Sequence, residues 1–202
     1  MMIKRKILQA MASVAVAISA FAIEGATQTS PKQIGNIKIE NFGQMDEKYY
    51  RGGQPAAVDF KALAALGVKT VIDLRNDPMD YEKSAAEAAG LKYVNIPMSA
   101  WRAPKDEDME RFLQVVDDPA SGTVFVHCKQ GKHRTGVASA IYRMSKYGWN
   151  YDKTYQEMEN YHFHPNLIHN SLKKYVHEFA VKNGLDEVKK ASAPAAAAKR
   201  AH

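Results

Sequence analysis

Hydrophobic and polar positions follow two alternating periods along most of this 202-residue chain. Residues 68–74, 91–96 and 123–127 are short and contain several β-branched or aromatic side chains, which is typical of buried strands. Between and after them, apolar residues recur at helical spacing, and several of these segments stop at a glycine, a common residue at helix ends. We predict helices over residues 56–66, 81–89, 106–116, 135–147, 151–161 and 166–182.

The order of these segments predicts the fold class. Strands that alternate with helices form a mainly parallel sheet covered on both faces, so we expect a single α/β domain with a central sheet flanked by helices. In such a sheet, ligands bind beyond the carboxyl ends of the strands. The loop that follows Val126 is therefore the place where we expect functional chemistry.

The N-terminal end has the pattern of a targeting segment. Residues 4–6 are basic, residues 7–21 are largely apolar, and residues 20–22 fit the small-x-small rule for cleavage, so we predict a signal peptide over residues 1–22. The mature protein would then be exported, to a bacterial periplasm or out of the cell, without stable membrane insertion. The alternative is an uncleaved anchor in the inner membrane, for which the apolar run is short.

Composition divides the rest of the chain. Residues 23–47 are predicted to be a polar leader segment, residues 48–182 the folded domain, and residues 183–202 a flexible tail rich in alanine and lysine. An apolar share of 46% and a charged share of 25% are ordinary for a globular protein and argue against global disorder. The single cysteine excludes an intramolecular disulfide.

The net charge of +6 raises the question of a nucleic-acid partner. The excess of basic residues lies at the two ends, because residues 23–188 hold 21 basic and 22 acidic side chains. The sequence also has no stripe of alternating basic and aromatic residues. We therefore predict no nucleic-acid binding.

The loop after Val126 combines a cysteine, an arginine and the start of a helix. A thiol attacks only as the thiolate, and a helix N-terminus both lowers a thiol pKa and binds anions. Cys128 stands at the end of the predicted strand, and Arg134 supplies a planar guanidinium that matches two phosphate oxygens. We predict that Cys128 and Arg134 carry out phosphoryl transfer.

The other loop residues suit the binding of one phosphoryl group. Gly131 permits the backbone turn that aims successive N–H groups at phosphate oxygens. The Thr135 hydroxyl can donate a hydrogen bond to the Cys128 thiolate. A lone cysteine after an apolar strand is ordinarily a small core residue, so the prediction depends on the combination. We assign phosphate binding to Lys129, Gln130, Gly131, Lys132, His133 and Thr135.

Residues 127–136 resemble the signature of the protein tyrosine phosphatase superfamily, His-Cys-x5-Arg-Ser/Thr, and match it at every fixed position. The form His-Cys-Lys-x-Gly-Lys-His-Arg-Thr-Gly is most similar to the atypical dual-specificity phosphatases of plants and fungi, whose substrates include inositol pyrophosphates, and to their bacterial relatives. Residues 50–55 and 71–75 also resemble early strand segments of such domains.

The resemblance implies a cysteine-phosphatase fold with the catalytic domain over residues 48–182. It implies a reaction in which Cys128 takes the phosphoryl group, Arg134 stabilises the transition state and water hydrolyses the phosphocysteine. Arg51 and Arg75 resemble residues near the family's site, with structural ion pairs as the alternative role.

The family's general acid is an aspartate on a loop after the preceding strand, but residues 97–104 contain no carboxylate. Protonation of the leaving group by such an acid contributes about 10²–10⁴-fold to the rate. Asp106 is our candidate, because its position resembles the loop-end aspartate of the plant and fungal group; the alternative role is a helix cap. An activated leaving group, such as a pyrophosphate, would need less protonation.

Charge around the loop bears on the substrate. Lys129, Lys132 and His133 suit a polyanionic ligand such as an inositol polyphosphate, and they equally fit a solvated basic loop. We predict a phosphorylated protein or a polyanionic small molecule as substrate, and no cofactor. We predict no metal, since the histidines at 162, 164, 169 and 177 lack a convincing ligand spacing. A catalytically weak phosphate-binding module and a rhodanese-like sulfurtransferase remain as alternatives.

Overall fold

The computed structural model describes residues 37–164 and 169–186. The predicted signal peptide over residues 1–22 and most of the predicted tail lie outside the described residues. The strands are β1 (Gly43–Asp46), β2 (Tyr49–Gly52), β3 (Val68–Arg75), β4 (Lys92–Met98) and β5 (Thr123–His127). The helices are α1 (Asp59–Ala65), α2 (Glu82–Ala88), α3 (Asp106–Asp117), α4 (Arg134–Tyr147), α5 (Tyr151–Asn160) and α6 (Asn170–Lys182), with a short 3-10 helix, η1, at Pro119–Ser121.

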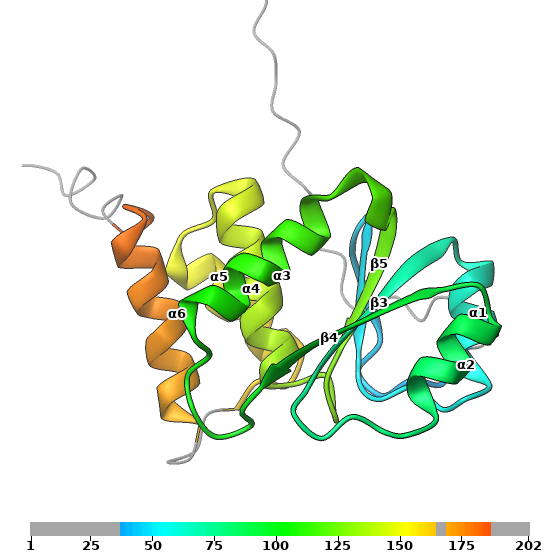
Figure 1. Cartoon of the computed structure of the whole chain (residues 1–202). Coiled ribbons are helices and arrows are strands. Elements are labelled where there is room, and N and C mark those ends of the chain that lie inside the picture. Colours follow the sequence, from blue (N-terminus) through cyan, green and yellow to red (C-terminus); the bar gives the residue numbers. More distant parts are fainter. Residues whose placement is uncertain (1–36, 165–168, 187–202) are drawn as a thin grey trace, which may run out of the picture.

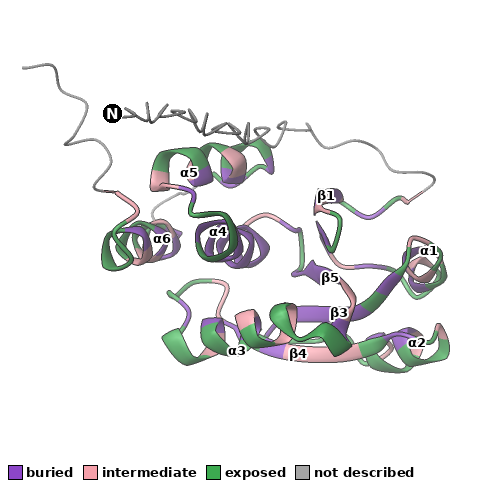
Figure 2. Ribbon diagram, turned by 90° about the horizontal axis from the view of Figure 1, so that it is seen from above, coloured by how far each residue is buried: buried purple, intermediate pink, exposed green. Residues whose placement is uncertain are grey.

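The strands form one sheet in the order β1-β2-β5-β3-β4. β2, β5, β3 and β4 are parallel to their neighbours, whereas β1 pairs with β2 in the antiparallel sense. Helices α1 and α2 lie on one side of the sheet and α3 to α6 on the other (Figures 1 and 2). The predicted α/β class, with a mainly parallel sheet flanked by helices, is therefore confirmed.

Each face of the sheet packs against its own hydrophobic core. Val71 and Phe125 point to the core shared with α1 and α2, whereas Ile72 and Val126 point to the core shared with α3, α4 and α6. Successive side chains of a strand point to opposite faces, so a strand buried on both sides reads as a continuous apolar run. This is why β3 and β5 can be predicted from the sequence.

β1 and β2 are not among the strands predicted from periodicity. β2 is fully buried although its sequence is Tyr-Tyr-Arg-Gly, and β1 alternates between buried and half-buried positions over only four residues. Such short and partly polar segments carry little periodic signal. β1 lies inside the predicted leader over residues 23–47, so the sheet begins before the predicted domain boundary at residue 48.

The six predicted helices are present, with shifted ends. The last begins at Asn170 rather than at residue 166, and residues 165–168 lie outside the described part of the chain. Among the helices that the structure describes, none combines the length and the apolar character needed to cross a bilayer. α4 is the central helix, since its residues from Arg134 to Met144 are all buried. Its N-terminus, next to the predicted site, is therefore held firmly in the fold.

Candidate active site

The loop that joins β5 to α4 lies at the carboxyl end of the parallel strands and borders a pocket of about 290 Å³. Three parts of the chain line this pocket: the loop itself, the segment that follows β4, and the residue that precedes α6. The lining residues are Ala100, Trp101, Cys128, Lys129, Gln130, His133, Arg134 and His169.

Cys128 is only 3% exposed, yet it lines the pocket. Burial alone raises the pKa of its thiol. Hydrogen bonds from the side chain and the N–H of Thr135, the positive charge of Arg134 and the N–H of Gln130 outweigh burial and hold the pKa of Cys128 below its ordinary value. The structure thus places Thr135 and Gln130 where they stabilise a thiolate, which is the nucleophilic form of cysteine.

Arg134 is the first residue of α4 and is 6% exposed. Its Nη1 donates to Asn76 Oδ1 at 3.1 Å and to the carbonyl of Met98 at 3.3 Å, and it lies 3.7 Å from Asp77 Oδ1. Asn76 and Asp77 follow β3, and Met98 ends β4. The carboxyl ends of two neighbouring strands therefore hold the guanidinium at the pocket.

The predicted phosphate-binding side chains divide into two groups. Lys129, Gln130 and His133 line the pocket beside the cysteine. Lys132 instead has its Nζ 3.0 Å from Glu40 Oε1 and lines a neighbouring hollow of about 570 Å³. The Lys132 side chain is therefore not among those that line the thiol pocket.

Gly131 shapes the loop in the way the sequence predicts. It adopts φ 68°, in the left-handed region that favours glycine. A Cβ at this position would lie 2.5 Å from the carbonyl carbon of Gly52 and 2.7 Å from the nitrogen of Gly53. The loop thus packs directly on the backbone that follows Arg51, and a residue with a side chain does not fit there.

Asp106 lies outside the residues that line the pocket. It is the first residue of α3, whose cap position is Lys105, and the cap makes no side-chain hydrogen bond. The Asp106 carboxylate accepts hydrogen bonds from the Tyr175 hydroxyl at 3.0 Å and from Lys182 Nζ at 3.1 Å, and these bonds hold its pKa below the ordinary value. A general acid must be protonated, so neither predicted role of Asp106 fits this geometry; the residue ties α3 to α6.

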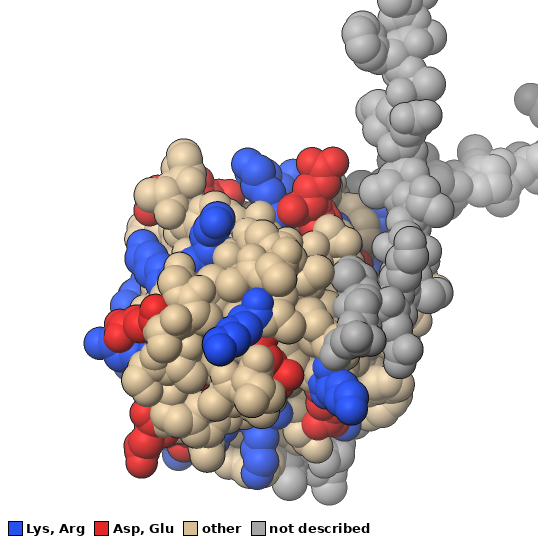
Figure 3. Space-filling view, turned by 90° about the vertical axis from the view of Figure 1, so that its right-hand side faces the viewer, with Lys and Arg blue, Asp and Glu red and all other residues tan. Residues whose placement is uncertain are grey.

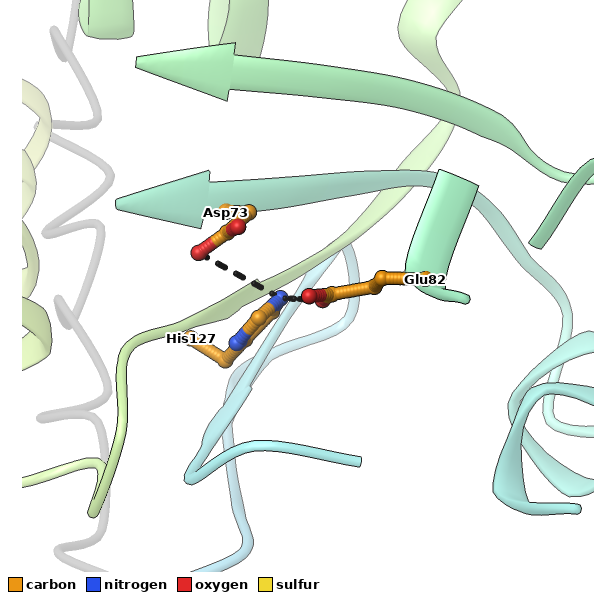
Figure 4. A group of neighbouring side chains, drawn as sticks. All are labelled: Asp73, Glu82 and His127. Carbon is orange, nitrogen blue, oxygen red and sulfur yellow. Dashed lines mark ion pairs between the residues drawn. The ribbon is translucent and has the colours of Figure 1, made fainter. Parts of the chain in front are cut away.

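Behind the loop lies a buried cluster of three titratable side chains (Figure 4). His127 Nε2 is 2.5 Å from Glu82 Oε1 and 3.9 Å from Asp73 Oδ1, and all three side chains are fully buried. Burial lowers the pKa of His127, but the bond to Glu82 and the charges of both carboxylates raise it overall. Burial also raises the pKa of Asp73. His127 belongs to the predicted loop, whereas Asp73 and Glu82 are not predicted as site residues.

This cluster also offers the donor types of a metal site, with its ligand atoms within 4.8 Å of one another. Two ligands of one tetrahedral zinc ion lie about 3.3 Å apart, because each is about 2.0 Å from the metal. The contact of 2.5 Å between His127 and Glu82 is shorter than that. We interpret the cluster as a buried ion pair that fixes the strand end next to Cys128.

Stacked rings form one wall of the pocket. The rings of His133 and His169 are parallel, with centroids 3.6 Å apart, and Trp101 stacks on His169 at 5.7 Å. Burial, followed by the neighbouring His169, lowers the pKa of His133 to about 4. His133 is therefore neutral near pH 7 and adds no positive charge to the pocket, contrary to the prediction from its sequence. His169 is not among the predicted site residues.

The family model for "DSP-PTPase phosphatase fused to NAD+ Kinase" matches residues 28–175. The chain belongs to this family. The matched region covers all five strands and the loop that carries Cys128 and Arg134. The resemblance to the dual-specificity branch of the protein tyrosine phosphatases is confirmed.

Curated relatives are similar over part of their length. The dual specificity protein phosphatase TpbA of Pseudomonas aeruginosa strain UCBPP-PA14 is 30% identical over 119 residues, which cover 59% of this chain and 53% of TpbA. The inositol diphosphatase DSP4 of Arabidopsis thaliana is 32% identical over 101 residues, which cover 48% of this chain and 51% of DSP4. The matched part of the chain thus spans about half the length of these relatives.

Solved structures share the fold. A crystal structure of a P. aeruginosa TpbA variant in complex with pTyr matches with a TM-score of 0.64 and 26% identity, covering 83% of this chain and all of that one. A putative phosphatase from Shewanella putrefaciens matches with a TM-score of 0.60 and 26% identity, covering 73% of this chain and 98% of that one. The predicted cysteine-phosphatase fold is therefore confirmed.

Proposed function

We propose that this chain is a cysteine-dependent phosphatase that hydrolyses phosphate monoesters through a phosphocysteine intermediate. The observation that carries the proposal is the environment of Cys128. Its pKa is held low within a loop of backbone N–H groups at a helix N-terminus, and the buried Arg134 lies beside it. One small pocket therefore combines an anion site with a nucleophile. Membership of the phosphatase family supports the same activity.

The reaction has two steps. In the first, Cys128 Sγ attacks phosphorus, so that the S–P bond forms and the bond to the leaving oxygen breaks. The loop N–H groups and Arg134 stabilise the charge on the three equatorial oxygens. In the second, water attacks the phosphocysteine, the S–P bond breaks, and inorganic phosphate and the thiolate are released. The proton lost by the attacking water passes to solvent or to the phosphate.

The leaving oxygen must be protonated, and the source of that proton restricts which substrates the site can hydrolyse. None of the described residues that line the pocket carries a carboxylate, so we propose that water supplies this proton. Leaving groups of low pKa need less protonation in the transition state. A phenol, with a pKa of about 10, or the phosphate of a phosphoanhydride therefore suits this site better than an aliphatic alcohol.

Two substrate classes are supported by separate observations. The stacked wall of His133, His169 and Trp101 offers a surface for an aromatic ring, as in phosphotyrosine, and a TpbA structure is titled as a complex with pTyr. Lys129 in the pocket and Lys132 in the neighbouring hollow provide positive charge for an inositol diphosphate, and DSP4 is named as an inositol diphosphatase. We propose phosphotyrosine as the first candidate and inositol diphosphates as the second.

Hydrolysis of p-nitrophenyl phosphate by purified protein tests the proposed activity. We expect Cys128→Ser to abolish turnover and Arg134→Ala to lower kcat by about 10²–10³-fold, the usual cost of losing a donor that stabilises the transition state. Arg111→Ala, which changes an exposed arginine of α3, is the matched control and keeps the wild-type rate. Equal rates in all four proteins would overturn the proposal. Binding of the ester without turnover in the wild type would identify a phosphate-binding module instead.

A substrate panel separates the two classes. Phosphotyrosine peptides and an inositol diphosphate are compared by kcat/KM with the wild type and with Trp101→Ala and Lys129→Ala. If an aromatic ring stacks on the wall, Trp101→Ala lowers kcat/KM mainly for the peptide. If a second phosphate group binds, Lys129→Ala lowers it mainly for the inositol diphosphate.

We also propose export of the protein by residues 1–22 and no nucleic-acid partner. Support for export is the basic, apolar and small-residue order of that segment. Support for the second point is the charge distribution, since acidic and basic side chains are interspersed on the face that Figure 3 shows. Fractionation of cells and N-terminal sequencing of the product test export. A protein that keeps residue 1 and sediments with membranes would indicate the anchor.

A further inference from the structure

Arg51 is a fully buried arginine on β2, the strand that lies between β1 and β5. Its guanidinium carbon lies 3.9 Å from the centroid of the Tyr161 ring, and its Nη2 donates to the carbonyl of Gly131 at 2.6 Å. Nε and Nη1 have no hydrogen-bond acceptor, and no carboxylate lies within ion-pair distance of Arg51 among the described residues. A buried charge without a counter-charge is strongly unfavourable, so this side chain requires an explanation.

Arg143 shows how the same fold accommodates an ordinary buried arginine. Its Nε and Nη2 bind both carboxylate oxygens of Glu157 at 2.8 to 3.2 Å. Arg75 likewise pairs with Asp77 at 3.0 Å. The structural ion pair that the sequence left open for both Arg51 and Arg75 is therefore found for Arg75 alone.

The hydrogen bond of Arg51 fixes one peptide of the loop that joins β5 to α4, residues 128–133, which we name the phosphate loop. The Gly131 carbonyl accepts from Arg51 Nη2 and from Asn41 Nδ2 at 2.9 Å, so two donors hold this oxygen on the outer side of the loop. In a planar trans peptide the following N–H, here that of Lys132, points to the opposite side. Arg51 and Asn41 thus turn one N–H group toward the interior of the loop.

The Lys129–Gln130 peptide of the loop is held in the same way, by a donor to its carbonyl, and its N–H binds an anion. The Lys129 carbonyl accepts from the backbone N–H of Gln54, two residues after the end of β2, at 3.1 Å. The N–H of the next residue, Gln130, donates to the Cys128 sulfur and lowers its pKa. Donors on the outside of the loop thus produce anion-binding N–H groups on the inside.

The charge of Arg51 has few anionic neighbours to balance it. Burial lowers the pKa of Arg51, and the neighbours whose negative charge would oppose this effect are Tyr161, Tyr49, Glu157 and Cys128. Burial raises the pKa of both tyrosines and so keeps them neutral. Glu157 is engaged by Arg143. The anion in the loop, either the Cys128 thiolate or a bound phosphoryl group, remains as the counter-charge for Arg51.

We propose that Arg51 is a positioning residue of the phosphate loop, which orients the Gly131–Lys132 peptide for anion binding and whose buried positive charge is balanced by the anion held in the loop. It acts through the Gly131 carbonyl rather than by touching the substrate. The proposal deepens the proposed phosphatase function and rests on it for its biological meaning. It is tested below by readouts that do not require turnover.

Alkylation by iodoacetamide reports on Cys128 alone, because the chain has no other cysteine. It measures both the pKa of the thiol and the affinity of the loop for phosphate. The pH dependence of the alkylation rate gives the pKa of the thiol, and protection by inorganic phosphate gives the phosphate affinity. Arg51→Met removes charge and hydrogen bond, whereas Arg51→Lys keeps the charge but loses the planar fork. Arg143→Met is the matched control, since it removes a buried arginine that has its own carboxylate partner.

We expect Arg51→Met to raise the midpoint of the alkylation profile by about one pH unit, the effect of losing a nearby opposite charge, and to weaken protection by phosphate at least tenfold. Arg51→Lys should restore most of the midpoint but not the protection. Arg143→Met should lower stability and move neither readout. Wild-type midpoint and protection in a folded Arg51→Met protein would overturn the proposal.

Asn41→Gly keeps the proposal falsifiable if Arg51→Met does not fold. It removes the other donor to the Gly131 carbonyl, and glycine accepts the φ of 55° at this position. We expect weaker protection by phosphate with a nearly unchanged thiol pKa. Wild-type protection in both Asn41→Gly and Arg51→Lys would overturn the proposal. If the wild type hydrolyses no phosphate ester, the proposed function fails, while these alkylation results still decide the role of Arg51.

Discussion

Substitution of Gly131 by alanine tests the packing of the phosphate loop on the end of β2. A residue with a side chain at φ 68° costs about 1–2 kcal/mol in backbone strain. The added Cβ would also lie 2.5 Å from the carbonyl carbon of Gly52 and 2.6 Å from its oxygen. Relief of such a clash by backbone movement costs about 1–3 kcal/mol more. We therefore expect Gly131→Ala to lower the free energy of unfolding by about 2–5 kcal/mol.

Gly148→Ala separates the cost of backbone strain from the cost of the steric clash. Gly148 has φ 61° at the end of α4, it is exposed, and no atom of the described residues lies within 4 Å of its added Cβ. This control should lose only the strain, about 1–2 kcal/mol, in an equilibrium urea titration followed by circular dichroism.

The clash should also displace the loop, because Gly52 is held in register with His127 in the sheet and cannot easily move. We expect the folded fraction of Gly131→Ala to hydrolyse p-nitrophenyl phosphate about 10²-fold more slowly, the effect of a misplacement of about 1 Å in a reacting group. Gly148→Ala should keep the wild-type rate. Equal losses of stability in the two variants, with wild-type activity in Gly131→Ala, would refute the described contact between the loop and β2.

Two further substitutions test the residues around the site. Asp106→Asn should leave the alkaline limb of the pH–rate profile unchanged and cost less than about 1 kcal/mol of stability, because an exposed ion pair is weak; loss of that limb would identify Asp106 as the general acid after all. Glu82→Gln should lower the free energy of unfolding by about 3 kcal/mol, because it leaves buried His127 without its partner. The pKa of His127 is raised in the folded state. The ion pair with Glu82 therefore contributes fully to the free energy of unfolding below about pH 6.5, and this contribution is lost as the pH rises through the raised pKa of His127. The difference between Glu82→Gln and wild type should therefore shrink in alkaline urea titrations, and a constant difference would contradict the ion pair.

The parts of the fold that the sequence predicts are those with a regular apolar period. β3 and β5 are buried on both faces and appear as continuous apolar runs. β2 is buried just as fully, but Arg51 and Gly52 interrupt its apolar run. Its place in the sheet comes from pairing with β5, far along the chain, and a local pattern does not contain that information.

The same distinction applies to the site. Cys128 and Arg134 are predictable because a single loop between a strand and a helix carries both residues and the chemistry they need. Asp106 stands at the expected position in the sequence, but its carboxylate is bound by two residues of α6. Glu82 looks like an ordinary helix-surface glutamate in the sequence, and only the packing of α2 against the sheet buries it.

Arg51 and Arg75 show why buried charge is a more specific indicator of function than net charge. Both are buried arginines on strands that flank β5, but Arg75 has Asp77 two residues later as its partner. Two acidic residues closely precede Arg51: Asp46 accepts hydrogen bonds from two tyrosines of α4, and Glu47 is exposed and forms no ion pair with Arg51 in the described structure. A buried cation that has no carboxylate partner in the described part of the chain is stable where a ligand or a reactive anion supplies the missing charge. The position of Arg51 against the loop therefore favours anion binding more strongly than the net charge of +6, which arises at the ends of the chain.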